Sequence, residues 1–126
     1  MAESIAGRLA LEQRMELAGY PPPTARQLEY LATIEAFQRL EGFAPTRREL
    51  GHLMGVASTK AVQDTLEALQ RKRLVAWAAG KARSLVLTAW AQAWLERHPE
   101  AVQAARESMA WEANRKAAHA AGGETP

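Results

Sequence analysis

The 126-residue sequence contains no cysteine, so disulfides and thiolate metal sites are excluded, as is usual in a reducing compartment. Aromatic residues make up only 6% of the chain, and no apolar run approaches the roughly 20 residues that a membrane-spanning helix requires. The first residues include early acidic side chains and no long apolar core, so we expect no signal peptide. A hydrophobic content of 48% instead indicates an ordinary globular domain.

Net charge is also small, at +2, but it is unevenly distributed. Residues 21–88 carry ten Lys and Arg against six Asp and Glu, a surplus of +4. Residues 1–20 (two against three) and 89–126 (four against five) each sum to −1. A basic middle segment is typical of proteins that bind a polyanion, although a surplus of this size also occurs in proteins that bind none.

Side chains suited to catalysis or metal binding are few. The three histidines, His52, His98 and His119, are scattered without the spacing of metal ligands. Ser58 and Ser84 have no evident histidine partner, and no glycine-rich phosphate loop occurs. We therefore expect no enzymatic activity, no metal and no cofactor.

The N-terminal part of the chain predicts two helices separated by a stiff connector. Residues 3–18 are rich in helix-forming side chains and are followed by Tyr20 and three prolines, so residues 1–20 are predicted to be a helical appendage. Thr24 and Gln27 then have the spacing of a capping box at the start of a long helix. Gly42 ends this helix. Its apolar residues recur every three positions: Leu28, Leu31, Ile34, Phe37 and Leu40.

A short helix, a third helix and a hairpin are predicted next. Thr46 and Glu49 form a second capping box, and Gly55 closes the short helix. The third helix spans residues 58–73, with Val62, Leu66 and Leu69 on its apolar face. Segments 74–78 and 84–88 flank a glycine-containing loop, as in a β-hairpin. This order predicts a mainly α winged helix-turn-helix over residues 21–88, with additional N- and C-terminal helices.

In a helix-turn-helix, the second helix of the pair can lie in the major groove of DNA, which admits one α-helix. Lysine can donate to guanine, glutamine can pair with adenine, aspartate can accept from cytosine, and small side chains can contact the thymine methyl group. The alternative is that these are ordinary solvated residues. The predicted base-reading residues are Ser58, Thr59, Lys60, Ala61, Gln63 and Asp64.

Contacts to the DNA backbone are expected around this helix, because phosphate contacts set the register of the complex and supply salt-dependent affinity. The predicted backbone contacts come from the first two helices and the hairpin: Arg26, Thr46, Arg47, Arg48, Lys81, Arg83 and Ser84. The basic run 71–73 has a simpler explanation, since cations in a last helical turn oppose the helix dipole.

About half of the chain resembles the N-terminal DNA-binding domain of the LexA repressor family. Similar strings in that family are T-x-RQ-x-E-x-L (here 24–31), PTR-x-E-[LI] (45–50), S-x-x-A-[AV] (58–62) and L-x-AL-x-RK (66–72). The resemblance implies the winged fold, binding of double-stranded DNA, and base contacts from the start of the third helix.

The departures from that family imply a changed operator. LexA-like proteins commonly have Asn at the position of Lys60, Glu at those of Gln63 and Asp64, and glycine at that of Arg73. The family also continues into a self-cleaving serine–lysine domain. The 38 residues after residue 88 are instead predicted to be helical, so we do not expect that domain in this sequence.

Residues 89–119 are predicted to form two helices that break at His98 and Pro99, and residues 120–126 a disordered tail. Three tryptophans in this region bury much apolar area if they are covered. They can pack on the winged domain or the N-terminal helix, or form a homodimer interface suited to paired half-sites. The candidate dimer residues are Trp90, Trp94, Val102, Met109 and Trp111.

These observations predict a sequence-specific double-stranded DNA-binding transcription regulator, in particular a repressor that acts as a homodimer. Two alternatives remain open. One is a replication or partition protein that uses the same fold at an origin, and the other is a protein-interaction module that acts on polymerase or a host regulator. The C-terminal helices are a candidate site for such a protein partner. The expected location is the cytoplasm of a bacterium, on the nucleoid, with the gene on the chromosome or a phage.

Overall fold

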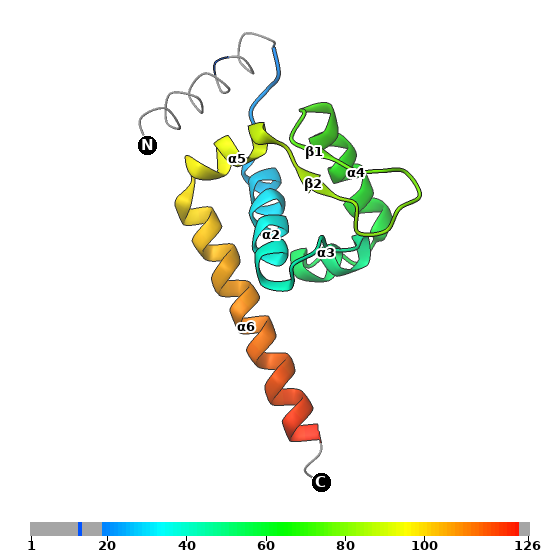
Figure 1. The fold of residues 1–126 in the computed structure, drawn as a ribbon, viewed down its shortest axis with the longest axis vertical. Helices are drawn as coiled ribbons and strands as arrows, with labels where there is room; N and C mark the ends of the chain where they lie inside the picture. Colours follow the sequence, from blue (N-terminus) through cyan, green and yellow to red (C-terminus); the bar gives the residue numbers. More distant parts are fainter. Residues whose placement is uncertain (1–12, 14–18, 124–126) are drawn as a thin grey trace.

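The computed structural model describes residue 13 and residues 19–123, with side chains described as far as residue 113. The helix predicted over residues 3–18 lies outside the described residues, apart from Gln13. The described elements are α2 (Ala25–Glu41), α3 (Arg47–Met54), α4 (Thr59–Arg71), β1 (Val75–Ala76), β2 (Val86–Leu87), α5 (Ala89–Glu96) and α6 (Pro99–Gly123) (Figure 1). This is the predicted winged helix-turn-helix, followed by two further helices.

Both predicted capping boxes are present. The Thr24 side chain accepts from the Gln27 amide at 3.1 Å, and the Gln27 side chain accepts from the Thr24 amide at 3.0 Å. Thr46 and Glu49 repeat the arrangement at 3.1 and 2.9 Å. Each box satisfies two backbone N–H groups that have no partner within the helix, so α2 and α3 begin where the sequence predicts.

α2 is the central helix, with α6 on one side and α3, α4 and the hairpin on the other (Figure 1). Leu31, Ile34 and Phe37 are buried as expected, but Tyr30 and Ala36 are buried too, and Leu40 is 52% exposed. A spacing of three residues falls short of the 3.6 residues per turn, so the predicted apolar row winds around the helix. Its last member, Leu40, therefore leaves the core.

α3 and α4 cross closely at Gly51, which is buried in the middle of α3. A Cβ at this position would lie 3.0 Å from the Val56 carbonyl oxygen and 3.1 Å from Val62 Cγ2. The helix-turn-helix therefore depends on a glycine here for close approach rather than for a special backbone conformation. The apolar face predicted for α4 is confirmed, since Val62, Leu66 and Leu69 are all buried.

The hairpin strands are shorter than predicted. Val75 pairs with Leu87 and Ala76 with Val86 in an antiparallel register. Beyond this pairing, the Ser84 hydroxyl accepts from the Ala78 amide at 3.0 Å and lies 2.8 Å from the Lys81 carbonyl, to which it can donate. A side-chain hydroxyl thus replaces the ladder of backbone bonds, and residues 77–85 form a compact loop, called the wing loop below.

α6 packs lengthwise against α2 and continues past the body of the domain (Figure 1). Ala105 and Met109 are buried in this contact, and Arg106 pairs with Glu35 at 3.2 Å. The helix runs to Gly123, whereas we expected it to end near residue 119, so residues 120–123 are helical rather than part of a disordered tail. Residues 124–126 lie outside the described residues. Among the helices of the described part, none combines the length and apolarity needed to cross a membrane.

Candidate nucleic-acid interface

The N-terminal turns of α4 present an exposed polar face. Ser58 is the N-cap, and its hydroxyl accepts from the Ala61 amide at 3.2 Å. Of the predicted base-reading residues, Gln63 is half-buried, and the other members of the set are exposed: Ser58, Thr59, Lys60, Ala61 and Asp64. Because the opposite face of α4 is buried in the core, these residues share one surface that is open to a ligand.

Lys60 and Asp64 form an ion pair on this face. The Lys60 Nζ lies 3.1 Å from Asp64 Oδ2, one helical turn away, and both side chains are more than half exposed. An exposed pair at this spacing is worth only about 0.3–0.5 kcal/mol, so a base can replace either partner at little cost.

Arg47 links three elements of the domain. Its Nε–H donates to Gln63 Oε1 at 3.1 Å, and its guanidinium lies 5.0 Å from the centre of the Trp77 ring at the start of the wing loop. Burial lowers the pKa of Arg47 below its ordinary value. Sequence reasoning did not single out Trp77, and no local pattern marks it, because its partner lies on a different helix.

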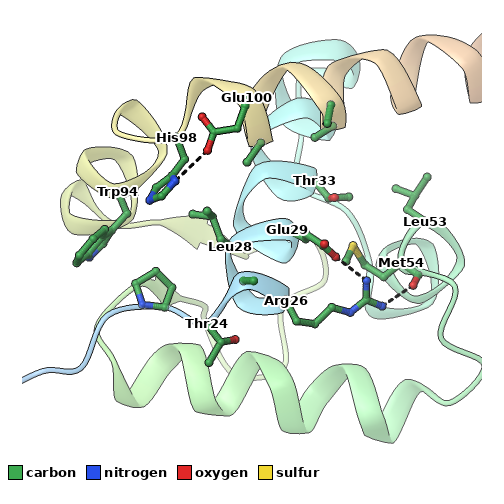
Figure 2. Close-up of a pocket in the computed structure, with 15 residues that line it drawn as sticks. Thr24, Arg26, Leu28, Glu29, Thr33, Leu53, Met54, Trp94, His98 and Glu100 are labelled. Atoms are coloured by element: carbon green, nitrogen blue, oxygen red, sulfur yellow. Dashed lines mark hydrogen bonds and ion pairs between the residues drawn. The ribbon is translucent and has the colours of Figure 1, made fainter.

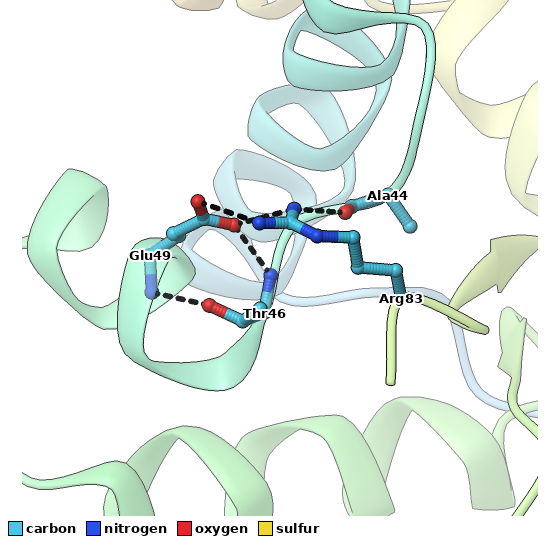
Figure 3. Close-up of polar contacts among 4 residues, drawn as sticks. All are labelled: Ala44, Thr46, Glu49 and Arg83. Atoms are coloured by element: carbon cyan, nitrogen blue, oxygen red, sulfur yellow. Dashed lines mark hydrogen bonds and ion pairs between the residues drawn. The ribbon is translucent and has the colours of Figure 1, made fainter. Parts of the chain in front are cut away.

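The Arg83 side chain is partly exposed and reaches toward Glu49 and the Ala44 carbonyl (Figure 3). It donates to both carboxylate oxygens of Glu49, at 2.8 and 3.1 Å, and to the Ala44 carbonyl at 3.0 Å. Its guanidinium also lies 4.4 Å from the centre of the Phe43 ring. We predicted a DNA backbone contact for Arg83. Its charge is already neutralised within the protein, and it anchors the wing loop to α3.

Three other predicted backbone contacts also have intramolecular partners. Arg26 donates to the Met54 carbonyl at 2.6 Å, at the end of α3, and pairs with Glu29 at 2.8 Å. Thr46 caps α3, and Ser84 closes the wing loop. Arg26 therefore ties α2 to the end of α3, a role that requires a contact across 28 residues and leaves no local sequence signal.

Arg48 and Lys81 differ from Arg26 and Arg83 in their charge balance. Both side chains are exposed, and within the part of the chain that the structure describes neither is paired with a carboxylate. Arg48 lies in the first turn of α3, and Lys81 lies on the wing loop. They are the predicted backbone contacts that combine exposure with a charge that no carboxylate offsets in the described residues.

Two residues of the basic run at the end of α4 make tertiary contacts, in addition to the interaction with the helix dipole that the sequence predicts. Lys72 Nζ donates to the Pro22 carbonyl at 2.9 Å and to Gln27 Oε1 at 2.6 Å. Burial lowers the pKa of Lys72 from its ordinary value of 10.5. Arg73 donates to the Tyr20 hydroxyl at 3.1 Å, so these two side chains hold the proline-rich connector against α4.

A separate cleft lies between α2, the end of α3 and the α5–α6 helices (Figure 2). Its charged groups are paired, Arg26 with Glu29 and His98 Nδ1 with Glu100 Oε1 at 3.0 Å. The pKa of Glu100 is lowered by two hydrogen bonds to its carboxylate, one with its own backbone and one with His98. The cleft has no surplus of positive charge and is not part of the candidate interface. In the described residues, no cluster of three or more histidine or acidic side chains is placed to hold a metal.

The candidate dimer residues do not behave as one surface. Met109 is buried within the chain, and Trp90, Trp94 and Val102 pack partly against the same core. Trp90 also lies 5.4 Å, centre to centre, from the Tyr20 ring. The prediction for Met109 is therefore corrected, because its side chain already packs inside a single chain. Trp111, by contrast, is 61% exposed.

The family model for the LexA DNA binding domain matches residues 20–84, which include α2, α3, α4, β1 and most of the wing loop. The LexA repressor of Myxococcus xanthus is 43% identical over 65 residues, which are 52% of this chain and 29% of that protein. The LexA repressor of Geotalea uraniireducens is 41% identical over 64 residues, 51% of this chain and 32% of that protein. The aligned part of this chain thus spans about 30% of the length of these relatives.

The aligned segment includes both the exposed face of α4 and the α3 residues that surround it. The resemblance inferred from the capping boxes and the α4 motifs is confirmed by the family model, which extends over half of the chain. The chain therefore belongs to the family of proteins that carry the LexA DNA-binding domain.

Proposed function

We propose that this protein is a sequence-specific double-stranded DNA-binding transcription regulator that lays the start of α4 in the major groove. The exposed polar face from Ser58 to Asp64, opposite a buried apolar face, is the observation that carries this proposal. The six base-reading residues of that face are proposed to contact base edges. Backbone N–H groups of the first turn add a weak preference for phosphate.

Phosphate contacts are proposed on both sides of α4. Lys81 on the wing loop and Arg48 in α3 supply charges that no carboxylate offsets in the described residues. Each phosphate contact makes the slope of log affinity against log salt about 0.9 unit steeper. Lys81→Ala should therefore weaken binding to every duplex and reduce the salt slope by about one unit.

We further propose that the regulator is a repressor that acts by occluding a promoter, and the similarity to LexA repressors supports the first part of this proposal. Lys60, Gln63 and Asp64 differ from the residues that the resemblance leads us to expect at their positions. Since these side chains are proposed to read bases, the operator should differ from the one that LexA repressors recognise.

A homodimer is the proposed assembly, because two-fold dimers suit paired half-sites. With Met109 buried, the proposed contact surface is the exposed side of α6 that carries Trp111. Sedimentation over a range of protein concentrations tests this assembly. A monomer at all concentrations, both alone and on DNA, would contradict it.

Selection of bound duplexes from a random pool is the direct test of DNA recognition. A palindromic consensus would support both sequence-specific binding and the two-fold assembly. Gel-shift titrations of the selected duplex at several salt concentrations would then compare wild type with Lys81→Ala. Recovery of no enriched sequence, together with no gel shift at moderate salt, would contradict the proposed function.

A further inference from the structure

Gln63 is a predicted base-reading residue whose amide is already engaged inside the protein. The Arg47 Nε–H donates to Gln63 Oε1 at 3.1 Å. An arginine N–H can only donate, so the opposite orientation of the amide would set two donors against each other. The contact therefore holds the Gln63 carbonyl toward Arg47 and turns the two Nε2 donors away from it.

Arg47 is itself held in place from the other side. Its guanidinium carbon lies 5.0 Å from the centre of the Trp77 ring, and its side chain is half-buried beside the wing loop. In the described part of the chain no carboxylate pairs with Arg47. Arg47 and Gln63 together thus carry one positive charge and several N–H donors, and the Arg47 N–H already uses one of the two lone pairs of the Gln63 carbonyl oxygen.

In the major groove, a surplus of hydrogen-bond donors favours some base edges over others. Adenine presents an acceptor at N7 and a donor at N6, so pairing with both uses an N–H and the carbonyl oxygen of one glutamine. Guanine presents two acceptors, N7 and O6, and therefore needs only donors. An Oε1 that already accepts from the cationic Arg47 is a weaker acceptor for adenine N6, and the same contact polarises the amide and strengthens its N–H donors, so Gln63 matches guanine better than adenine.

We propose that Gln63 reads a guanine, and that Arg47 and Trp77 are positioning residues that impose this choice. The inference rests on the proposed function, because it specifies what the α4 surface selects. It also replaces two expectations from the sequence, which placed adenine opposite Gln63 and a phosphate opposite Arg47.

The test uses the full chain and a duplex selected from the random pool. Each guanine of that duplex is replaced in turn by adenine, by 7-deazaguanine, which lacks the N7 acceptor, and by inosine, which keeps N7 and O6. The relevant position is the one at which Gln63→Met abolishes discrimination. There, wild type should lose about 10-fold in affinity with adenine or 7-deazaguanine and should bind inosine as well as guanine.

Variants of the positioning residues should change this preference. Arg47→Met removes the donor but keeps a long side chain against Trp77, so the freed amide can pair with adenine. The ratio of the affinity for the guanine duplex to that for the adenine duplex should then fall to about 1 or below. Trp77→Ala should lower the same ratio, and Trp77→Phe, which keeps an aromatic face, should restore most of it. Arg48→Met is the matched control, since it removes a neighbouring exposed charge and should leave the ratio unchanged.

The affinities for the two duplexes are measured on one protein preparation, so their ratio does not depend on the fraction of a variant that is folded. If Arg47→Met weakens binding equally on guanine and adenine, Arg47 is a phosphate contact and the proposal is wrong. A guanine preference that survives Gln63→Met at every position would also overturn it. A wild-type chain that enriches no sequence at all would instead contradict the proposed function.

Discussion

Arg83 of the wing loop and Glu49 of α3 face each other with two N–H···O contacts, 2.8 and 3.1 Å long, across 34 residues of sequence (Figure 3). Glu49 also completes the capping box with Thr46. The same carboxylate thus begins α3 and fixes the wing loop beside it. A wing loop anchored in this way holds Lys81 and Trp77 in a defined place relative to α4.

The Arg83–Glu49 pair should make stability depend on acidic pH. Hydrogen bonds from Arg83 are the largest cause lowering the pKa of Glu49 below its ordinary value of 4.5. A lowered folded-state pKa gives stability that is present above about pH 4.5 and is lost as pH falls through the folded-state value. Both side chains are more than a third exposed, so solvent screening limits the effect to about 1 kcal/mol or less.

Glu49→Gln isolates this effect, because glutamine can still accept at the capping box but carries no charge. Urea unfolding should show wild type more stable than the variant at pH 7, with the difference shrinking as pH falls below about 4.5. A difference that stayed constant across this range would show that the charge of Glu49 contributes nothing.

Gly51→Ala should destabilise the domain although alanine is the better helix former. Helix propensity favours alanine by about 1 kcal/mol. The new Cβ would, however, lie 3.0 Å from the backbone oxygen of Val56, and such overpacking costs about 1–3 kcal/mol. Because backbone cannot rotate away as a side chain can, we expect a net loss in the free energy of unfolding. His52→Ala, at the exposed neighbouring position, is the control, and a Gly51→Ala variant as stable as wild type would refute the close crossing.

Arg73 holds a positive φ of 63° just after α4, where glycine is the usual residue. Leu74 N donates to the Leu69 carbonyl at 3.0 Å, which closes the helix in the same way as a glycine cap. A left-handed conformation costs a side-chain-bearing residue about 1–2 kcal/mol. Arg73→Gly should therefore be about 1 kcal/mol more stable than Arg73→Ala, since both variants lose the contact with Tyr20 equally. Thermal unfolding of the pair provides the comparison, and equal midpoints would contradict it.

Met109→Ala should show that α6 belongs to the fold of a single chain. The side chain is 5% exposed between α6 and α2, and truncating a buried methionine costs about 2–4 kcal/mol. Trp111→Ala removes a larger but 61% exposed side chain two residues away and should cost under about 1 kcal/mol in the monomer. Chemical unfolding at low protein concentration measures both. Equal losses would mean that α6 does not pack on α2 as described.

Local chemistry accounts for the parts of the fold that were predicted well. The capping boxes at Thr24 and Thr46 each use residues three apart, and the buried face of α4 repeats at helical spacing, so a short window of sequence contains all the partners. Two details were wrong. Leu40 leaves the core because a three-residue spacing drifts around the helix, and the strands are shorter than predicted because the Ser84 hydroxyl takes the place of backbone pairing.

The sequence by itself determined the order of helices, their starts, and a set of polar side chains on one face of α4, because these follow from contacts within one or two turns. The tertiary structure alone decided which cations find distant partners within the chain. Arg26 and Arg83 contact groups 28 and 34 residues away, whereas Arg48 and Lys81 are not paired with any carboxylate in the described residues. It also decided the orientation of the Gln63 amide, since only folding brings Arg47, which lies over the Trp77 ring, against it.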